Sequence, residues 1–239
     1  MSYQFYSATV IKIVDETPNV KRFFLKMPEE IKFEFKAGQF VMLNLPLEGN
    51  ITNRSYSIAS APSNDNIFEL CASLKKDGKG TPWLWNNVNV GTKLDCTGPL
   101  GKFILPETID YDLCFIATGT GIAPLRSMIL DIYNRNLPHK NIYLIFGNRW
   151  VKDILYHADF QELALQHQEF KFIPVLSRET KETWNGYIGY VHQVYLEIFK
   201  DNRKAYFYLC GWSNMIKEAR MALKEKGYTK NELKFELYD

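Results

Sequence analysis

A run of seven residues in the first half of the chain, Arg54-Ser55-Tyr56-Ser57-Ile58-Ala59-Ser60, combines a permanent cation, an aromatic ring and several hydroxyl groups. A guanidinium fork matches the oxygens of a phosphate, and a tyrosine ring can lie against a flat heterocycle. Because side chains alternate along a β-strand, Arg54 and Tyr56 would share one face while Ser55 and Ser57 share the other. The run predicts a site for a flat ligand that carries phosphate. The alternative is an ordinary barrel strand with an exposed arginine and a half-buried tyrosine.

A second candidate for binding an anion is the loop Gly78-Lys79-Gly80-Thr81-Pro82. Thr81 can cap a helix and Pro82 suits the first helical position, so the loop predicts a short helix over residues 81–87. The amides at the start of a helix are free and the helix dipole is positive there, which favours an anion. A glycine-rich turn before any surface helix looks the same. The prediction of an anion site at this loop is supported by Arg54, which offers a second contact to the same phosphate.

Four further groups of residues each follow a short apolar run in the second half. In Thr118-Gly119-Thr120-Gly121-Ile122-Ala123-Pro124, two glycines precede a proline that can begin a helix, so a pyrophosphate can approach bare amides. This G-x-G-x-x-P pattern departs from the dinucleotide fingerprint at the third glycine. Arg149 and the pair Ser177-Arg178 put an arginine where a ribose or its phosphate would lie, although loop arginines are commonly solvated. Cys210-Gly211 places a thiol at a strand end, where a lone cysteine commonly serves only packing.

The elements that must position the first two groups have the pattern of a small antiparallel barrel. Short β-rich runs alternate with turn residues at intervals of about 8–12 residues, as in sandwiches and barrels. The rhythm changes after Pro106, so we expect a first domain over residues 1–106 and a second over residues 107–239. The predicted strands of the barrel cover residues 8–14, 20–26, 39–45, 55–59, 67–73 and 93–97.

The second domain alternates strands with helices. This alternation predicts a parallel sheet that is covered on both faces, and such sheets bind ligands beyond the carboxyl ends of their strands. All four groups of loop residues follow predicted strands, so we expect them at that edge. The predicted strands cover residues 113–117, 141–146, 170–176, 205–210 and 233–237, and the helices cover residues 125–134, 160–166, 191–199 and 214–226.

Composition excludes several classes of protein. Of the 239 residues, 46% are apolar and 23% are charged, which is typical of a globular protein with a well-developed core. A net charge of +2 is too small for nucleic-acid binding as the main activity. The four cysteines have no spacing that suits zinc or an iron–sulfur cluster, so we expect reduced thiols and no metal.

No apolar run approaches the roughly 20 residues that span a bilayer, and the N-terminus lacks the layout of a signal peptide. We expect a cytoplasmic protein without a membrane partner; a monomer is favoured, and the sequence leaves the oligomeric state open.

In this order the motifs resemble the ferredoxin–NADP⁺ reductase family across essentially the whole chain. Arg54-Ser55-Tyr56-Ser57 is similar to the flavin motif of that family, residues 78–81 to its flavin-phosphate loop, and residues 119–124 to its nicotinamide-dinucleotide loop. Cys210-Gly211 resembles the nicotinamide-side motif, and residues 235–239 resemble the closing Glu-x-aromatic, although Asp239 follows the aromatic residue here. The resemblance implies an antiparallel Greek-key β-barrel that binds FAD, followed by an α/β domain with a parallel, Rossmann-like sheet that binds NADP, with NAD as the alternative.

The same resemblance implies roles for individual residues. Arg54 would hold the flavin phosphate, Tyr56 would pack against the isoalloxazine, and Ser57 would hydrogen-bond near its reactive N5. Gly80 and Thr81 would hold the pyrophosphate end of the flavin cofactor. The catalytic positions would be Ser57 near the flavin N5, Cys210 and Glu236 on either side of the nicotinamide, and Tyr238 over the other flavin face. The remaining cofactor-binding positions would be Ser55, Cys71, Ser73, Leu74, Gly78, Thr118, Gly119, Thr120, Gly121, Pro124, Arg149, Ser177, Arg178 and Gly211.

The choice between NADPH and NADH depends on few residues. Arg149 with Ser177-Arg178 resembles the 2′-phosphate contacts of family members that use NADP. Tyr187 and Ile188 occupy positions where such members often add a second cation, and Ser-Arg also occurs in reductases that use NADH. The sequence favours NADPH.

The activity that the resemblance implies is hydride transfer from nicotinamide C4 to flavin N5, followed by release of electrons to a one-electron carrier such as ferredoxin or flavodoxin. These carriers are acidic, and two basic surfaces could receive them. The alternatives are the reductase component of an oxygenase, a reductase of free flavins, and a flavin- or nucleotide-binding regulatory module without activity. The first basic surface would be Lys75, Lys76, Lys79, Lys93 and Lys102, and the second the helix face with Lys217, Arg220 and Lys224.

Overall fold

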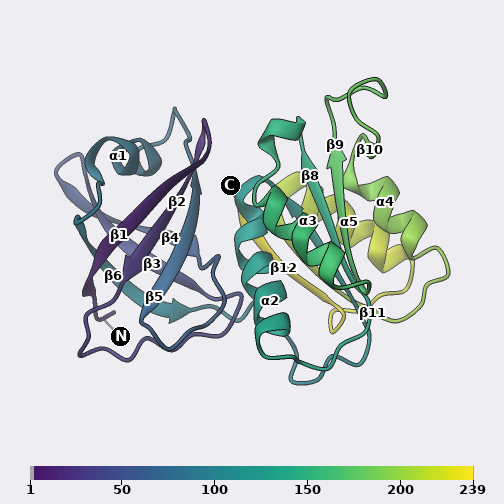
Figure 1. Cartoon of the computed structure of the whole chain (residues 1–239), viewed down its shortest axis with the longest axis horizontal. Helices are drawn as coiled ribbons and strands as arrows, with labels where there is room; N and C mark the ends of the chain where they lie inside the picture. The colour runs from purple at the N-terminus through teal and green to yellow at the C-terminus, as the bar shows by residue number, and fades with distance from the viewer. Residues whose placement is uncertain (1–2, 239) are drawn as a thin grey trace. The chain divides into compact units, whose positions relative to one another are not determined.

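Six short strands in the first hundred residues form an antiparallel barrel. In the computed structural model, which describes residues 3–238, they are β1 (Tyr6–Thr17), β2 (Val20–Lys26), β3 (Phe40–Leu47), β4 (Asn50–Ser57), β5 (Ile67–Ser73) and β6 (Lys93–Leu100) (Figure 1). Their order is β4-β3-β6-β1-β2-β5, and a bridge between Ile58 and Leu70 joins the two outer strands, which closes the sheet. Neighbours that are not consecutive in sequence, such as β2 with β5, make the topology the predicted Greek key.

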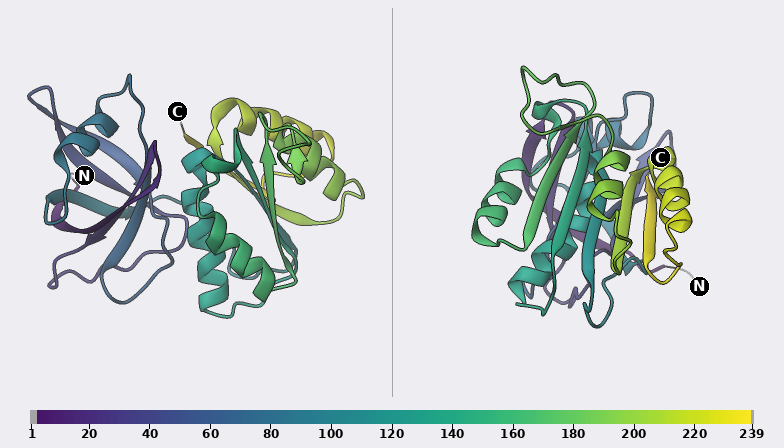
Figure 2. Two further views of the ribbon diagram at one scale, coloured as in Figure 1. Left: turned by 45° about the horizontal axis from the view of Figure 1, so that its top comes forward. Right: turned by 90° about the vertical axis from the view of Figure 1, so that its right-hand side faces the viewer.

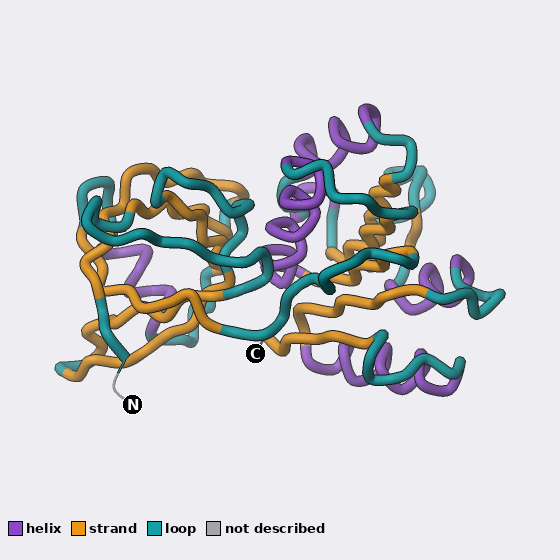
Figure 3. Tube along the Cα trace, turned by 90° about the horizontal axis from the view of Figure 1, so that it is seen from below, coloured by secondary structure: helices purple, strands orange, loops and turns teal. Residues whose placement is uncertain are grey.

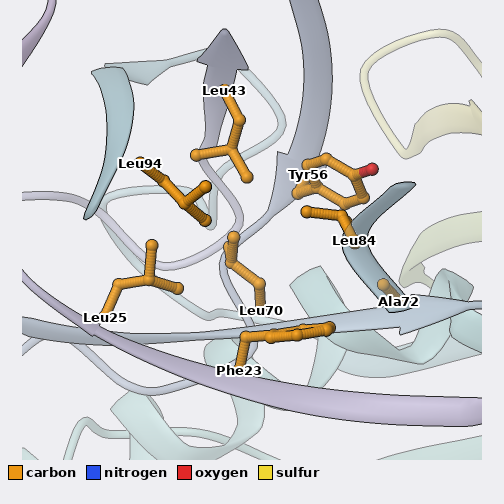
Figure 4. A pocket seen from close by; sticks show the side chains of 8 residues that line it. All are labelled: Phe23, Leu25, Leu43, Tyr56, Leu70, Ala72, Leu84 and Leu94. Carbon is orange, nitrogen blue, oxygen red and sulfur yellow. The ribbon is translucent and has the colours of Figure 1, made fainter. Parts of the chain in front are cut away.

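The barrel interior is filled by apolar side chains that alternate with outward-pointing side chains along the strands. Every second residue of β2, among them Phe23 and Leu25, points inward and meets inward residues of the other strands. The helix α1 (Gly80–Asn87) adds Leu84 to this interior. Figure 4 shows the small apolar cavity that these side chains line together with Leu43, Tyr56, Leu70, Ala72 and Leu94. Because Leu25 is fully buried, its replacement by alanine would cost about 2–5 kcal/mol of unfolding free energy.

The second half of the chain folds around a parallel sheet. Its strands are β7 (Asp112–Thr118), β8 (Ile142–Asn148), β9 (Phe170–Leu176), β10 (Tyr187–Ile188), β11 (Ala205–Trp212) and β12 (Leu233–Tyr238). They lie in the order β10-β9-β8-β7-β11-β12, and each neighbouring pair is parallel. The chain runs from β7 outward to β10 on one side and then returns to β11 on the other. The strand order therefore reverses between β7 and β11, and open sheets of this kind bind ligands at such a point.

Helices cover both faces of this sheet (Figure 2). The buried residues Val194 of α4 (Val191–Ile198) and Ile216 of α5 (Ser213–Glu225) pack in one core with Val175 of β9. Side chains of the opposite parity on β9 meet α3 (His157–Gln166), where the ring of Phe160 lies 5.3 Å from that of Phe172. The short 3-10 helices η1 (Gly119–Gly121) and η2 (Val151–Asp153) follow β7 and β8.

The chain divides into two compact units. The first comprises Met1–Leu105 with Arg126–Arg135, and the second comprises Pro106–Leu125 with Asn136–Asp239. The helix α2 (Ile122–Asn134) is thus shared, a feature that the predicted boundary after residue 106 does not include. Arg126 and Ser127 of this helix hydrogen-bond to the barrel residues Ala59 and Ser60.

The predicted strands and helices are present, and the differences lie mainly at their ends (Figure 3). The strand β4 begins at Asn50 rather than at residue 55. Residues 50–53 pair with β3 in a hairpin, and their single apolar residue, Ile51, is exposed, so they show no alternation of buried and exposed side chains. The two-residue strand β10 was not predicted from the sequence. None of the helices in residues 3–238 combines the length and the apolar character needed to cross a bilayer. Asp239 lies outside the described residues.

Candidate functional site

The side chain of Arg54 lies directly against Gly80, so the structure brings the two predicted phosphate contacts together. A methyl group at Gly80 would be only 3.3–3.5 Å from the Cγ, Nε and Cδ atoms of Arg54. Glycine thus allows the close approach of the α1 N-terminus to the arginine. The Nη1 of Arg54 donates to the carbonyl of Asn53 at 2.9 Å, and no other hydrogen bond of this guanidinium occurs among the described residues. The remaining N–H donors of the fork can reach an anion.

The loop before α1 is held in a fixed shape. The Gly78 amide donates to the Lys75 carbonyl at 2.8 Å, and the Thr81 hydroxyl accepts from the Lys75 amide at 2.9 Å. The first turn of α1 has no side-chain cap, so its amides and positive dipole remain for an anion. Lys79 pairs with Glu48 at 2.5 Å. Together with Arg54, the loop fits the phosphate groups of a dinucleotide flavin.

Tyr56 and Ser57 at the end of β4 are placed on opposite faces. The ring of Tyr56 lines the barrel cavity, with its hydroxyl pointing away from the aliphatic side chains (Figure 4). Burial raises the pKa of Tyr56 to about 12, so the phenol stays protonated near neutral pH. Ser57 is 5% exposed, whereas Ser55 is exposed. The predicted alternation along the strand thus matches the structure, and only the part of the Tyr56 ring outside the barrel core is open to a flavin.

The β5 positions assigned to the flavin lie on the outer face of the barrel. Phe68, Leu70 and Ala72 belong to the barrel core, whereas the intervening Cys71 does not and is buried elsewhere. Ser73 at the strand end is exposed. The amide of the following Leu74 donates to the Asn19 carbonyl at 2.8 Å, so its backbone is already engaged.

In the second unit, the loop after β7 and the end of β11 interlock where the strand order reverses. The hydroxyl of Thr118 accepts a hydrogen bond from the Trp212 amide at 2.9 Å. A methyl group at Gly211 would overlap that hydroxyl, and one at Gly121 would overlap the Cys210 carbonyl. Gly211 also has a φ of 132°, which side chains rarely adopt. The backbones of the two predicted glycine motifs therefore lie in direct contact with each other.

The loop that follows β7 leads directly into the helix α2. Gly119–Gly121 form η1, with Gly119 at a φ of 53°, exposed, and with open space around its Cα. Thr120 is half-buried, and the buried Pro124 lies in the first turn of α2. A turn of bare backbone before a helix fits a pyrophosphate.

Cys210, Glu236 and Tyr238 are brought together by strand pairing. Cys210 lies opposite Glu236, and Trp212 lies opposite Tyr238, in the parallel pair of β11 and β12. Burial and the neighbouring Glu236 carboxylate raise the pKa of the Cys210 thiol well above its usual value. The sulfur is therefore a protonated thiol at neutral pH, suited to contact with a ring and not to nucleophilic attack.

Arg149 and Arg178 are also neighbours. The Arg178 amide donates to the Arg149 carbonyl at 3.0 Å, and the Ser177 amide donates to the Asn148 carbonyl at 3.0 Å. The carboxylate of Glu179 further joins the two loops, because it accepts from the Val151 amide at 3.0 Å. Both arginine side chains are exposed. The pair can offer two cations to one phosphate.

The five predicted basic residues of the first unit do not form one surface. Lys93 begins β6 and Lys102 follows its other end, roughly 25 Å away at 3.3 Å per residue. The second predicted surface is present, because Lys217 and Lys224 are exposed on α5 with Met221 between them. The guanidinium of Arg220 lies 3.7 Å from the centre of the Phe235 ring on β12.

A buried ion-pair group in the first unit was not predicted from the sequence. Glu69 on β5 is 2% exposed and contacts both Arg22 and Arg126. One signal was available, since an acidic residue between Phe68 and Leu70 in an apolar strand needs a buried partner. The partner Arg126 lies far along the chain and shows no pattern of its own.

Comparison with known proteins identifies both units. Residues 7–104 match the model of the oxidoreductase FAD-binding domain, and residues 115–221 match that of the oxidoreductase NAD-binding domain. The phenol hydroxylase P5 protein of Acinetobacter pittii is 34% identical over 93% of this chain and 62% of its own length. Ferredoxin–NADP reductase B of Sorangium cellulosum is 30% identical over 98% of both chains. The crystal structure of the Amycolatopsis cytochrome P450 reductase GcoB superposes with a TM-score of 0.88 at 29% identity, over 99% of this chain and 71% of that one.

The relatives differ in length. This chain spans 62% of the phenol hydroxylase P5 protein and 61% of the glycine betaine monooxygenase reductase subunit of Chromohalobacter salexigens. It spans nearly all of the Sorangium reductase. The matched part of this chain contains the FAD-binding domain and the NAD-binding domain.

Proposed function

This chain belongs to the ferredoxin–NADP⁺ reductase family, and we propose that it passes electrons between NADPH, or NADH, and a one-electron protein carrier. The observation that carries the proposal is the junction of the Thr118 loop with Cys210-Gly211, beside Glu236, at the reversal of strand order. A regulatory module would need only the phosphate-binding parts of the two units.

The residues of the first unit would hold FAD by its phosphates and present its ring. Arg54 and the α1 N-terminus would bind the phosphates, and Ser57 would hydrogen-bond to the flavin ring. Bound FAD supplies the ability to take two electrons with a hydride and to release them singly, so that one nicotinamide serves two one-electron acceptors. Catalysis by the protein is then mainly orientation and exclusion of water.

The residues of the second unit would hold the nicotinamide dinucleotide as substrate. Thr118 and the turn of Gly119–Gly121 would receive its pyrophosphate, and Cys210 with Glu236 would contact the nicotinamide ring. The protonated Cys210 thiol offers a polarisable contact without a charge beside the ring. Tyr238 remains the residue that we propose to cover the flavin and to move aside for the nicotinamide.

We propose NADPH as the preferred donor because Arg149 and Arg178 lie on two loops that are hydrogen-bonded together. Two exposed guanidinium groups can pair with a 2′-phosphate, which NADH lacks. Comparison of the affinities for 2′,5′-ADP and 5′-AMP tests this preference without any electron transfer. Equal affinities would contradict it, and loss of the difference in Arg178→Ala would identify the cation responsible.

For the carrier we propose an acidic protein such as ferredoxin or flavodoxin. The basic stripe of Lys217 and Lys224 on α5, with Met221 between them, combines positive charge with an apolar contact. Electrostatic steering of this kind makes association rates fall steeply with salt. A reduction rate that does not change between low and high salt would contradict docking on this stripe.

The proposal is tested with the purified chain loaded with FAD. Addition of NADPH without air should bleach the flavin absorbance, and ferredoxin or flavodoxin should then restore it in two one-electron steps. Ser57→Ala should retain the flavin and slow its reduction. A colourless protein that cannot be reconstituted with FAD would overturn the proposal.

A second candidate function is the reductase component of an oxygenase. It is favoured by the phenol hydroxylase P5 protein, which is 34% identical to this chain over 93% of the chain. The half-reaction with the nicotinamide is the same, and only the acceptor differs. Rates measured in parallel with ferredoxin, flavodoxin, an oxygenase component and free flavin would decide between the two, because the physiological acceptor should give the highest kcat/KM.

A further inference from the structure

Glu69 is a buried carboxylate that is held by two arginines. Its Oε1 accepts from the Nε of Arg22 at 2.6 Å and its Oε2 accepts from the Nη2 of Arg22 at 3.2 Å, so this pair is bidentate. The Nη1 of Arg126 donates to the same Oε2 at 3.3 Å. Glu69 is 2% exposed and Arg126 is 8% exposed. A buried charge is costly unless it is paired, and because this carboxylate and both arginines pair with one another, removal of either arginine would leave part of the carboxylate uncompensated.

The contacts of this group converge on residues 58–60, the segment that directly follows Ser57. The Nη1 of Arg126 donates to the carbonyl of Ala59 at 3.0 Å, and the hydroxyl of Ser127 donates to the carbonyl of Ser60 at 2.6 Å. From the other side, the Ala59 amide donates to the Glu69 carbonyl at 2.8 Å. The Glu69 amide in turn donates to the Ser60 hydroxyl at 3.1 Å.

The position of the segment explains why it needs such support. The regular pairing of β4 with β3 ends at Ser57, and a single bridge from Ile58 to Leu70 follows. A chain that leaves a ladder is free to change its φ and ψ angles, which would rotate Ser57 away from a ligand. The carbonyls of Ala59 and Ser60 point to α2, where the charged Arg126 and the hydroxyl of Ser127 fix them.

We propose that Arg126, supported by Glu69, is a positioning residue for the flavin: it fixes residues 58–60 and thereby the orientation of Ser57 and Tyr56. This inference rests on the proposed flavin site in the first unit. Arg22 donates to the same carboxylate and also to the Oε2 of Glu16 at 3.1 Å, so we give it the structural role of the group without the positioning role.

The test compares Arg126→Met with the matched control Arg22→Met. FAD affinity of each apoprotein is measured by quenching of flavin fluorescence, the thermal midpoint of each apoprotein by circular dichroism, and the environment of the bound ring by the visible circular dichroism of the flavin. Both variants should lower the thermal midpoint, because each removes one partner of the buried carboxylate. Arg126→Met should in addition weaken FAD binding about tenfold, as expected for loss of a charged hydrogen bond, and alter the flavin spectrum. Arg22→Met should change neither by a comparable amount.

Two further variants keep the test decisive. Arg126→Lys retains the charge and should recover part of the affinity for FAD. Ser127→Ala removes only the hydrogen bond to the Ser60 carbonyl and should change the flavin spectrum in the same direction with little effect on folding, so it replaces Arg126→Met if that variant does not fold. Equal effects of Arg126→Met and Arg22→Met on FAD affinity, or an unchanged flavin spectrum in both Arg126→Met and Ser127→Ala, would overturn the inference. Failure of the wild-type apoprotein to bind FAD would instead overturn the proposed function.

Discussion

The amide of Trp212 donates a hydrogen bond of 2.9 Å to the hydroxyl of Thr118 and so joins the ends of β11 and β7. This bond lies where the order of the parallel strands reverses, beside the turn of Gly119–Gly121. The two residues are 94 positions apart in the sequence, yet their bond fixes the separation between the loop that we propose for the pyrophosphate and the strand end that we propose for the nicotinamide.

Thr118→Val tests the importance of this bond. Valine has the shape of threonine but accepts no hydrogen bond, so the Trp212 amide loses its partner and the loop loosens. We expect nucleotide affinity to fall by roughly 1 kcal/mol, or about fivefold. Titration calorimetry with NADP⁺ measures the change, and Thr118→Ser, which keeps the acceptor, serves as the control. Equal affinities for the valine and serine variants would show that the bond does not position the loop.

Gly211→Ala tests the close approach of the two backbones. Its new methyl group would overlap the Thr118 hydroxyl, and its φ of 132° is strained for alanine. Gly227→Ala is a matched control, because Gly227 has a φ of 96° with open space around it. We expect both variants to lose about 1 kcal/mol or more of stability from backbone strain. Only Gly211→Ala should also lose nucleotide binding; retained binding would indicate that the strand end can shift without consequence.

Arg54→Met tests the phosphate contact of the first unit. Loss of a charge-assisted pair with phosphate should weaken FAD binding by about 1.5–3 kcal/mol, or roughly 10- to 150-fold. Lys79→Met is the control, because Lys79 is a nearby cation that is paired with Glu48. Fluorescence titration of the apoproteins measures both. A larger loss of FAD affinity in Lys79→Met than in Arg54→Met would indicate that the phosphate contacts Lys79 and not Arg54.

The pH dependence of folding should include a contribution from His157. Burial lowers the pKa of His157, which begins α3 and packs against Phe172. Since the folded-state pKa lies below the unfolded value of about 6.5, protonation favours the unfolded state. This contribution to stability is complete above the unfolded pKa and is lost as the pH falls through the folded pKa. His157→Gln should therefore reduce the difference in thermal midpoint between pH 7.5 and pH 5.5. An unchanged difference would assign the pH dependence to other groups.

Local patterns in the sequence were sufficient for the elements and for the order of the motifs. The alternating barrel strands, the change to strand–helix alternation after Pro106 and the glycine-rich turns each depend on neighbouring residues. The family resemblance rests on the same local motifs, and the matching FAD-binding and NAD-binding domain models confirm it. The proximity of Arg54 to Gly80 was expected from their chemistry alone.

Only the tertiary structure decided which distant residues meet. The pairing of Cys210 with Glu236 depends on the register of β11 and β12, and one step of register would place different residues side by side. The group of Arg22, Glu69 and Arg126 depends on the packing of α2 against barrel residues, to which no local pattern in residues 122–134 points. The basic stripe on α5 follows from helical spacing, whereas Lys93 and Lys102 of the first unit are separated because they lie at opposite ends of β6. Short-range periodicity thus specifies each element and its faces, but contacts between remote residues are fixed by packing and register, which a linear pattern does not contain.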